Sequence, residues 1–243
     1  MPDMPQDKPQ ERALTVARLG SVDYAVALEL QNALVLARLA GQIGDTLLLL
    51  EHPHVFTLGR GADQRFLLNP AGVPVYRVSR GGQVTYHGPG QLIGYPIVRL
   101  EGPERDVIDY LRKLESVLIE ALAAVGLAAG RRDGLTGVWL GPEKIASIGV
   151  GFRRWVSLHG FALNVSTDLS FFDAIVPCGI SGCRMTSIAA QGLDSITIEG
   201  FAEVVEHAFA AKFGYQQIRA ASPAEIWNLL DCAAGSGEAR GQT

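Results

Sequence analysis

The feature that most constrains this chain is a series of strand-like segments through its middle, with helix-like segments on either side. Seven short apolar runs, separated by turn residues, have the length and residue types of strands: residues 46–50, 55–58, 75–80, 91–98, 137–140, 144–150 and 155–165. Four longer segments predict helices: residues 21–40, 104–125, 197–212 and 223–232. Because the strands cluster between helices, the pattern predicts an α+β fold, with a mixed β-sheet flanked by helices.

Two of the predicted helices carry signals at their ends. Ser21 is a residue type that caps helices, and the apolar residues after it share one helix face: Val22, Val26, Leu30 and Leu34. Gly126 is expected to end the second helix, because glycine readily adopts the left-handed conformation that follows many helices.

The length and composition fit a single globular domain. Hydrophobic residues make up 48% and charged residues 19% of the 243 residues, which is typical of a chain with a packed core. Residues 13–232 are predicted to form this domain. Residues 1–12 are rich in Pro, Gln and charge, and residues 233–243 in Gly, Ser and Glu, so both are predicted to be flexible tails.

Composition and spacing exclude several classes of partner. The net charge is −4 without a basic stripe, so we expect no nucleic acid. No apolar run approaches the roughly 18 residues of a membrane span, and no signal-peptide core is found, so we expect no membrane and a cytoplasmic location. Three cysteines do not make a disulfide framework. His52 and His54 flank a proline, but no further ligand stands at a useful spacing, so no metal is expected.

The segment RGGQVTYHGPGQ (residues 80–91) is the first candidate for a binding site. Glycine at four positions lets the backbone approach a ligand closely, and polar groups stand beside it: Arg80, Thr85, His87 and Gln91. Its glycines also fit an ordinary hairpin connection with solvated polar residues. The spacings of a phosphate loop and of a dinucleotide fingerprint are both missing.

Two strand segments carry further candidates. Lys144 enters the apolar segment KIASIG (residues 144–149), where a buried ammonium would act strongly on nearby groups; a strand-end lysine that reaches solvent is the alternative. In HGFALNV (residues 159–165), Gly160 and Ala162 share one face of a strand and could leave room for an alkyl chain. Tight packing against a neighbouring element is the alternative, and on this segment alone it is the stronger one.

Cys178 is the candidate nucleophile. Pro177 stiffens the chain before it and Gly179 frees the chain after it, which favours presentation of the thiol at a turn. An inert thiol in the core is the alternative. Cys183 and Cys232 lack this setting and are interpreted as structural residues, and no motif supports a redox pair between Cys178 and Cys183.

Taken together and in order, these segments resemble the lipoyl(octanoyl) transferases, the octanoyl-carrier-protein:protein N-octanoyltransferases of lipoate biosynthesis. Residues 80–91 with Tyr95 are similar to the family signature R-G-G-x-x-T-Y-H-G-P-G-Q-x-x-x-Y. Five shorter blocks are similar to other family motifs: EHP (51–53), FTLGR (56–60), DGLTGVW (133–139), KIASIG (144–149) and PCGI (177–180). The resemblance covers nearly the whole chain.

The resemblance implies a fold like the catalytic domain of biotin and lipoate protein ligases. It implies Cys178 as the acyl-thioester nucleophile, and Lys144 as the group that lowers the pKa of that thiol and shuttles protons. It also implies substrate contacts from three segments: Arg80, Gly81, Gly82, Gln83, Val84, Thr85, Tyr86, His87, Ser147, Ile148, Gly149, Gly160, Phe161 and Ala162. His87 and His159 stay open between a role in orienting substrate and a structural role.

The reaction that the resemblance implies is the first step of endogenous protein lipoylation. An octanoyl (or lipoyl) group passes from octanoyl-acyl-carrier protein to a specific lysine of lipoyl domains. The implied acceptors are the lipoyl domains of 2-oxoacid dehydrogenase E2 subunits and the glycine cleavage H protein. No cofactor is expected, because a carrier-protein thioester is already activated and its transfer needs no ATP. We expect a monomer.

The chemistry explains why a lysine would accompany the cysteine. A thiol with a pKa of about 8.5 is only a few per cent ionised at neutral pH. An ammonium about 4 Å away, at an effective dielectric of about 20, favours the thiolate by up to about 4 kcal/mol. This exceeds the roughly 2 kcal/mol that brings the thiol pKa to about 7. In the second half-reaction the acceptor lysine must lose a proton, and the same pair is the candidate for shuttling it.

Two other functions compete with this interpretation. An ATP-dependent lipoate or biotin ligase of the same fold would not depend on a cysteine and would release pyrophosphate. A non-catalytic module that docks acyl-carrier or lipoyl domains would not need Cys178 and Lys144 in their motifs.

Overall fold

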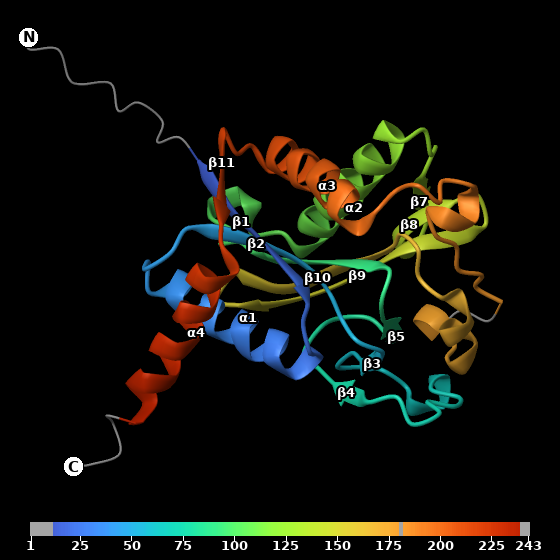
Figure 1. Cartoon of the computed structure of the whole chain (residues 1–243), viewed down its shortest axis with the longest axis horizontal. Helices are drawn as coiled ribbons and strands as arrows, with labels where there is room; N and C mark the ends of the chain where they lie inside the picture. The colour runs from blue at the N-terminus through green and yellow to red at the C-terminus, as the bar shows by residue number, and fades with distance from the viewer. Residues whose placement is uncertain (1–11, 180–181, 239–243) are drawn as a thin grey trace, which may run out of the picture.

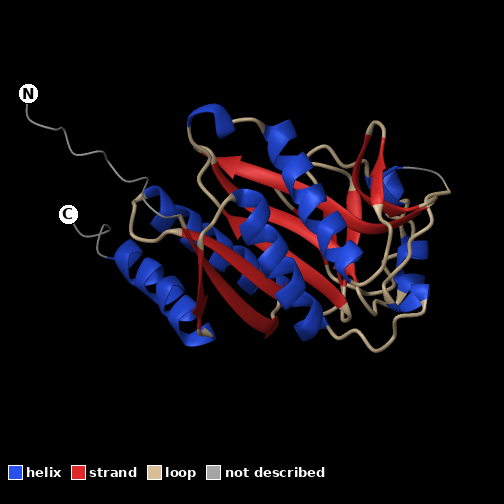
Figure 2. Cartoon of the chain, turned by 90° about the horizontal axis from the view of Figure 1, so that it is seen from above, coloured by secondary structure: helices blue, strands red, loops and turns tan. Residues whose placement is uncertain are grey.

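A large mixed sheet with helices on both faces forms the centre of the molecule (Figure 1, Figure 2). This computed structural model describes the backbone of residues 12–179 and 182–238, and their side chains except at positions 178 and 231–238. The predicted α+β class, a mixed sheet flanked by helices, is confirmed. Within the described residues, no helix has both the length and the apolar character needed to cross a bilayer.

The large sheet combines parallel and antiparallel pairs. Its eight strands lie in this order: β11 (Gln217–Ala221), β1 (Ala13–Ser21), β2 (Asp45–Glu51), β6 (Gln91–Ile97), β10 (Val156–Asn164), β9 (Glu143–Arg153), β8 (Leu135–Leu140) and β7 (Gly130–Arg132). Strand β1 pairs in parallel with both β11 and β2, and every later pair in that order is antiparallel. The four strands β6, β10, β9 and β8 provide the framework for the site described below.

Two pairs of helices cover the two faces of this sheet. Helices α2 (Val107–Ala124) and α3 (Ile198–Phe213) cover one face, and α1 (Tyr24–Leu39) and α4 (Pro223–Glu238) cover the other (Figure 1). Strand β2 contributes side chains to the cores on both faces. Leu47 and Leu49 pack in the core beneath α2 and α3, and Leu48 and Leu50 pack in the core beneath α1. Successive strand residues point to opposite faces, so an unbroken apolar run is needed here.

Helix α1 begins later than its predicted cap. Asp23 is the N-cap, and its carboxylate accepts the Ala25 N–H at 2.8 Å, whereas Ser21 is the last residue of β1. Val26 was predicted to share a helix face with Leu30 and Leu34, and it is 40% exposed whereas those two leucines are buried.

The other helix ends are closer to the predictions. Asp106 caps α2, and Gly126 after that helix has φ +84°, as predicted for a helix end. Thr197 caps α3 by accepting the Gly200 N–H. Helix α4 continues to Glu238, past the domain boundary predicted at residue 232. Positions 1–11 and 239–243, in the two predicted tails, lie outside the described residues.

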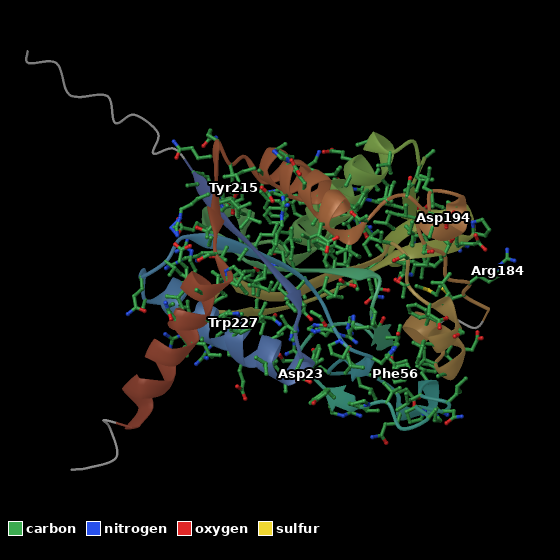
Figure 3. The ribbon with its side chains drawn as sticks, in the orientation of Figure 1. Asp23, Phe56, Arg184, Asp194, Tyr215 and Trp227 are labelled. Atoms are coloured by element: carbon green, nitrogen blue, oxygen red, sulfur yellow. The ribbon has the colours of Figure 1, made fainter. Side chains whose placement is uncertain are left out.

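A second sheet of three strands lies beside the large one and carries the middle of the glycine-rich segment. Its strands are β4 (Val75–Arg77), β3 (Val55–Leu58) and β5 (Val84–His87), with β3 in the centre. A separate core holds it against residues 169–175: Phe56, Leu58, Val84, Tyr86, Phe172 and Ile175. Phe56 marks this core in Figure 3, far from Tyr215 at the opposite edge of the molecule.

Candidate active site

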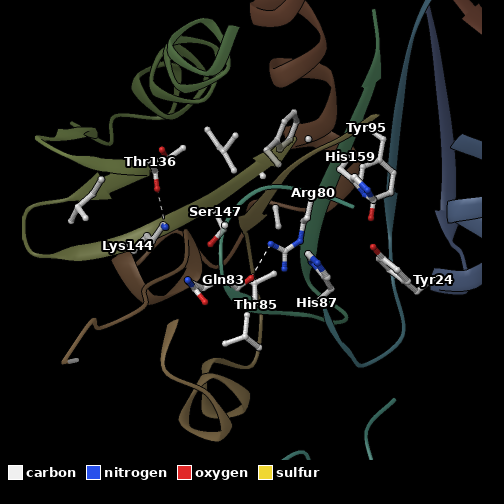
Figure 4. Close-up of a pocket in the computed structure, with 18 of the residues that line it drawn as sticks. Tyr24, Arg80, Gln83, Thr85, His87, Tyr95, Thr136, Lys144, Ser147 and His159 are labelled. Atoms are coloured by element: carbon white, nitrogen blue, oxygen red, sulfur yellow. Dashed lines mark hydrogen bonds between the residues drawn. The ribbon is translucent and has the colours of Figure 1, made fainter. Parts of the chain in front are cut away.

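A cavity of about 230 Å³ opens where the glycine-rich segment meets β9 and β10 (Figure 4). Most of the residues predicted to contact substrate line it: Arg80, Gly82, Gln83, Val84, Thr85, His87, Ser147, Ile148, Gly149, Gly160, Phe161 and Ala162. Seven other residues complete the lining: Tyr24, Tyr95, Gly134, Leu135, Thr136, Lys144 and His159. Gly81 and Tyr86, which were also predicted to contact substrate, do not line it. Segments far apart in the sequence therefore meet around one space.

The guanidinium of Arg80 holds the glycine-rich segment in shape. It is 7% exposed and donates to the carbonyl oxygens of Thr57 at 2.7 Å and Gln83 at 2.9 Å. Gly59 lets the second sheet approach this loop, because a Cβ built on it would lie 2.1 Å from the carbonyl oxygen of Gly82. The early block FTLGR and the glycine-rich signature thus form one packed unit.

Tyr86 and Gly81 support the same segment from outside the cavity. The ring of Tyr86 is fully buried, stacks on Phe171 at 4.8 Å between centroids, and its hydroxyl pairs with His54 Nδ1 at 2.7 Å. The N–H of Gly81 donates to the carbonyl oxygen of Val150 on β9 at 2.9 Å. Their contacts are with the protein, which explains why neither lines the cavity.

Lys144 lies at one end of the cavity (Figure 4). It is 1% exposed, and its Nζ donates to the carbonyl oxygen of Thr136 at 3.0 Å and lies 5.4 Å from the centre of the Trp139 ring. The alternative of a strand-end lysine that reaches solvent is therefore wrong. A buried ammonium acts strongly on neighbouring groups, because the surrounding dielectric is low.

The chain that carries Cys178 is held by backbone hydrogen bonds before and after the cysteine. Before it, the Val176 N–H donates to the Phe66 carbonyl oxygen at 2.8 Å. Cys178 itself lies in the single turn η4 (Pro177–Gly179), and its side chain is outside what the structure describes, as is Ile180. After it, the backbone of Lys144 pairs with Arg184 and Thr186, with both N···O distances 2.9 Å. Residues 184–186, which follow the cysteine segment in the sequence, therefore pair with Lys144 through the backbone.

Cys183 is half-buried and follows the same turn, with its Sγ 4.0 Å from the Arg184 carbonyl oxygen. It stands next to the exposed Arg184, which lies at the edge of the molecule in Figure 3, and its structural role stays a prediction. The side chain of Cys232 lies outside the described residues.

Gly160 provides close strand packing. A Cβ built on it would lie 2.2 Å from the Gly94 carbonyl oxygen on β6 and 2.6 Å from Pro96 Cδ. The preceding residue, His159, has φ +57°, which bends β10 at this point. The small size of residue 160 therefore serves packing, the alternative that the sequence left open, while Ala162 borders the cavity.

The far end of the cavity is polar and holds neutral histidines. Both ring nitrogens of His87 are engaged, Nδ1 with Gln91 Oε1 at 2.9 Å and Nε2 with Thr57 Oγ1 at 3.2 Å. Burial keeps the pKa of His87 well below its ordinary value, and repulsion from a protonated His52 and from the charge of Arg80 lowers it further. The engaged ring and this pKa favour a structural role for His87 over proton transfer.

His52 and His159 are also buried and neutral near pH 7. His52 pairs with the Val22 carbonyl oxygen at 2.6 Å and the Tyr95 hydroxyl at 2.7 Å, and burial lowers its pKa to about 4. Burial, with a smaller effect of the Arg80 charge, likewise lowers the pKa of His159 to about 4. Within the described part of the chain, no group of three His, Cys, Asp or Glu side chains is arranged to hold a metal ion.

We expect the free energy of unfolding to fall as the pH is lowered from about 6.5 to about 4. The unfolded chain accepts protons on His52 and His159 near pH 6.5, whereas the folded chain accepts them only near pH 4. The stabilisation is therefore complete above the unfolded pKa and lost as the pH falls to the folded pKa. Each histidine contributes about 3 kcal/mol to this change. Urea unfolding at a series of pH values measures it, and equal stability at about pH 7 and about pH 4.5 would contradict it.

Several lining residues carried no clear signal in the sequence. Tyr24 is the first residue of α1 and reaches the cavity only because of the way that helix crosses the sheet. Tyr95 and Thr136 stand in blocks that resemble family motifs, so their positions could have been suspected. His159 was left open, and it is identified as a lining residue by the fold.

Comparisons with known proteins identify the family and the fold. Residues 23–210 match the family model described as the lipoyl protein ligase A/B catalytic domain. An octanoyltransferase of Solibacter usitatus is 49% identical, over 87% of this chain and 98% of its own, and one of Gloeobacter violaceus is 50% identical, over 81% and 89%. The fold is similar to that of a bi-partite lipoate protein ligase of Thermoplasma acidophilum, with a TM-score of 0.67, 17% identity, and coverage of 91% of this chain and 90% of the other.

Proposed function

The chain belongs to the octanoyltransferases of the lipoyl protein ligase A/B catalytic domain family, and from this premise we propose that it transfers octanoyl groups through a thioester on Cys178. The chain is an acyltransferase of protein lipoylation. The donor that we propose is octanoyl-acyl-carrier protein, and the acceptors are lysines of lipoyl domains, in E2 subunits of 2-oxoacid dehydrogenases and in the glycine cleavage H protein.

The reaction balances as two acyl transfers. In the first, the Cys178 thiolate attacks the carbonyl carbon of the donor thioester, a new carbon–sulfur bond forms, and the carrier thiol leaves and takes up a proton. In the second, the neutral acceptor amine attacks the Cys178 thioester, an amide forms, and the Cys178 thiolate leaves. The proton that the amine loses must pass to a nearby base, and the Lys144–Cys178 pair is proposed for this role.

The observation that carries the proposal is the buried ammonium at the end of the cavity. Lys144 is 1% exposed and lines the cavity together with apolar residues that suit an alkyl chain: Val84, Leu135, Ile148, Phe161 and Ala162. Its own backbone is paired with the chain that follows Cys178. A thiol presented here would meet both a positive charge and an apolar channel.

An ATP-dependent ligase remains the rival function, because the fold is shared with lipoate protein ligases and does not separate the two activities. The identity to octanoyltransferases, near 49% for the Solibacter usitatus protein, favours transfer. A thiol-blocking reagent should stop the transferase and spare a ligase. Pyrophosphate release on addition of ATP and a free acid would favour the ligase.

The proposal is tested by the mass of the intact protein after incubation with octanoyl-carrier protein alone. We expect one octanoyl group to be added, and peptide mapping to place it on Cys178. Addition of a lipoyl domain should then return the chain to its original mass as the acceptor gains the group. The matched control is Cys183→Ser, which should be acylated like the wild type. An unmodified wild-type chain that still transfers octanoyl would rule out the thioester.

A further inference from the structure

The side chain of Lys144 lies across Gly137 of the neighbouring strand β8. A Cβ built on Gly137 would lie 2.5 Å from Lys144 Cε, 2.6 Å from the Ala146 carbonyl oxygen and 3.0 Å from Lys144 Nζ. Non-bonded carbon atoms settle at about 3.5–4.0 Å, so this Cβ would overlap the lysine by about 1 Å. Gly137 also has φ +129°, a conformation that favours glycine. Because residue 137 has no side chain, the Lys144 side chain has room to lie across it.

The pairing of β8 with β9 is irregular at this point. Val138 pairs with Ala146 and Trp139 pairs with Lys144, so the register shifts by one residue between them. Bulges of this kind change the direction of a side chain and are common beside active sites. Here the irregularity accompanies the turn of the Lys144 side chain toward the Thr136 carbonyl oxygen.

Glu115 of α2 holds Gly137 from the side of the helix. Its carboxylate is fully buried, and Oε1 accepts the Gly137 N–H at 3.1 Å. Oε2 accepts from Arg112 Nη1 at 2.7 Å and from Arg131 Nε at 2.8 Å. Burial of a carboxylate destabilises a protein unless the carboxylate is paired with a positive charge and hydrogen-bonded. The Glu115 carboxylate has two guanidinium partners on one oxygen, and its other oxygen accepts a single backbone N–H. The acyl transfer steps described above leave this group unused.

We propose that Glu115 and Gly137 are positioning residues for the Lys144 ammonium. Glu115 fixes the backbone of residue 137 against α2, and Gly137 leaves the space that the lysine side chain occupies. The inference rests on the proposed role of Lys144 and deepens it. Because Coulomb energy and proton transfer both depend steeply on distance, an ammonium that must serve a thiolate and an amine needs a fixed place.

Gly137→Ala tests the inference, with Gly141→Ala as its matched control. Both glycines lie on the same β8–β9 hairpin and both have a positive φ, +129° and +54°, so alanine strains the backbone at either position. A Cβ on Gly141 meets no atom within 4 Å, whereas one on Gly137 meets the Lys144 side chain and the Ala146 carbonyl oxygen. The control therefore accounts for the strain of alanine at a positive φ, and the position of the Lys144 ammonium itself must be measured to show that the lysine moves.

The place of the ammonium can be read by NMR of protein labelled with ¹⁵N-lysine. The chain has only four lysines, at positions 8, 113, 144 and 212, and the Lys144 signal is the one missing from Lys144→Met. Its Nζ lies 5.4 Å from the centre of the Trp139 ring, so ring currents make the signal sensitive to position. We expect it to move in Gly137→Ala and in Glu115→Leu, and to stay in place in Gly141→Ala.

Octanoyl transfer is measured on the same proteins. A displacement of about 1 Å lowers the rate of a catalytic step by up to about a hundredfold, which is the loss expected for Gly137→Ala. An unmoved Lys144 signal in Gly137→Ala, or a moved signal with full transfer, overturns the inference while the proposed function stands. Full transfer by Lys144→Met would overturn the proposed role of Lys144 and the inference together, so the two failures are distinguished.

Discussion

Replacing Cys178 with alanine is expected to abolish octanoyl transfer, with a loss of at least about three orders of magnitude in rate. Alanine removes the atom that holds the acyl group between the two proteins, and the amine of the acceptor is mostly protonated at neutral pH and cannot attack the carrier thioester efficiently by itself. Serine at this position should fail as well, because a hydroxyl ionises far less readily than a thiol. The measurement is octanoyl incorporation into a lipoyl domain.

A Cys178→Ala variant could also lose activity because it misfolds, and this must be distinguished from loss of the nucleophile. The turn that carries Cys178 is held through its backbone, by the hydrogen bonds of Val176 to Phe66 and of Gly179 to Val176, and both are available to an alanine variant. The free energy of unfolding should therefore stay within about 1 kcal/mol of the wild type. Cys183→Ala, a change of the same kind five positions along, should keep both stability and transfer. Full transfer by purified Cys178→Ala would end the covalent mechanism.

Within the described residues, the sequence pattern predicted all four α-helices and most of the strands, and left out β1, β5, β7 and β11. Strand β2 is an unbroken run of leucines, and α3 begins at a clear threonine cap, so both were predicted. Strand β11 exists because it pairs with β1, which lies at the other end of the sequence, and β7 is a short edge strand; neither has an apolar pattern of its own. Strand β5 lies within the glycine-rich segment, and its alternating buried residues Val84 and Tyr86 are too few to predict a strand between the flanking glycines.

The sequence predicted the site residues whose side-chain chemistry stands in a motif. It did not predict the residues whose role depends on where the fold places them. Lys144 and Arg80 stand in recognisable motifs, and both line the cavity. Tyr86 is in the same motif yet points into a separate core, because alternate residues of a strand face opposite sides. Glu115 resembles any charged residue of an amphipathic helix in the sequence. Only the fold shows that its carboxylate is buried against the Gly137 amide.

Lys144→Met is expected to slow acylation of Cys178 by about a hundredfold to ten thousandfold, the range for loss of a general acid–base group. Methionine fills nearly the same space beside Gly137 and Trp139 without an ammonium, so the change removes charge and proton together while keeping the packing. The stabilisation of the thiolate by the ammonium, up to about 4 kcal/mol if the two lie about 4 Å apart, is lost with it. Lys113→Met, on the surface of α2 beside Asp109, is the control and should transfer normally.

Lys144→Arg then separates the two roles of this lysine. Arginine keeps a positive charge that favours the thiolate, but it does not give up a proton in proteins and so cannot shuttle one. Rapid-quench measurement of each half-reaction should show acylation partly retained and transfer to the lipoyl domain strongly slowed. The guanidinium is larger than the ammonium, and the space beside Gly137 is narrow: a Cβ built on Gly137 would lie only 2.5 Å from Lys144 Cε. We therefore expect the steric effect of arginine alone to lower the rate of Cys178 acylation. Wild-type rates in both steps would make Lys144 an electrostatic partner only.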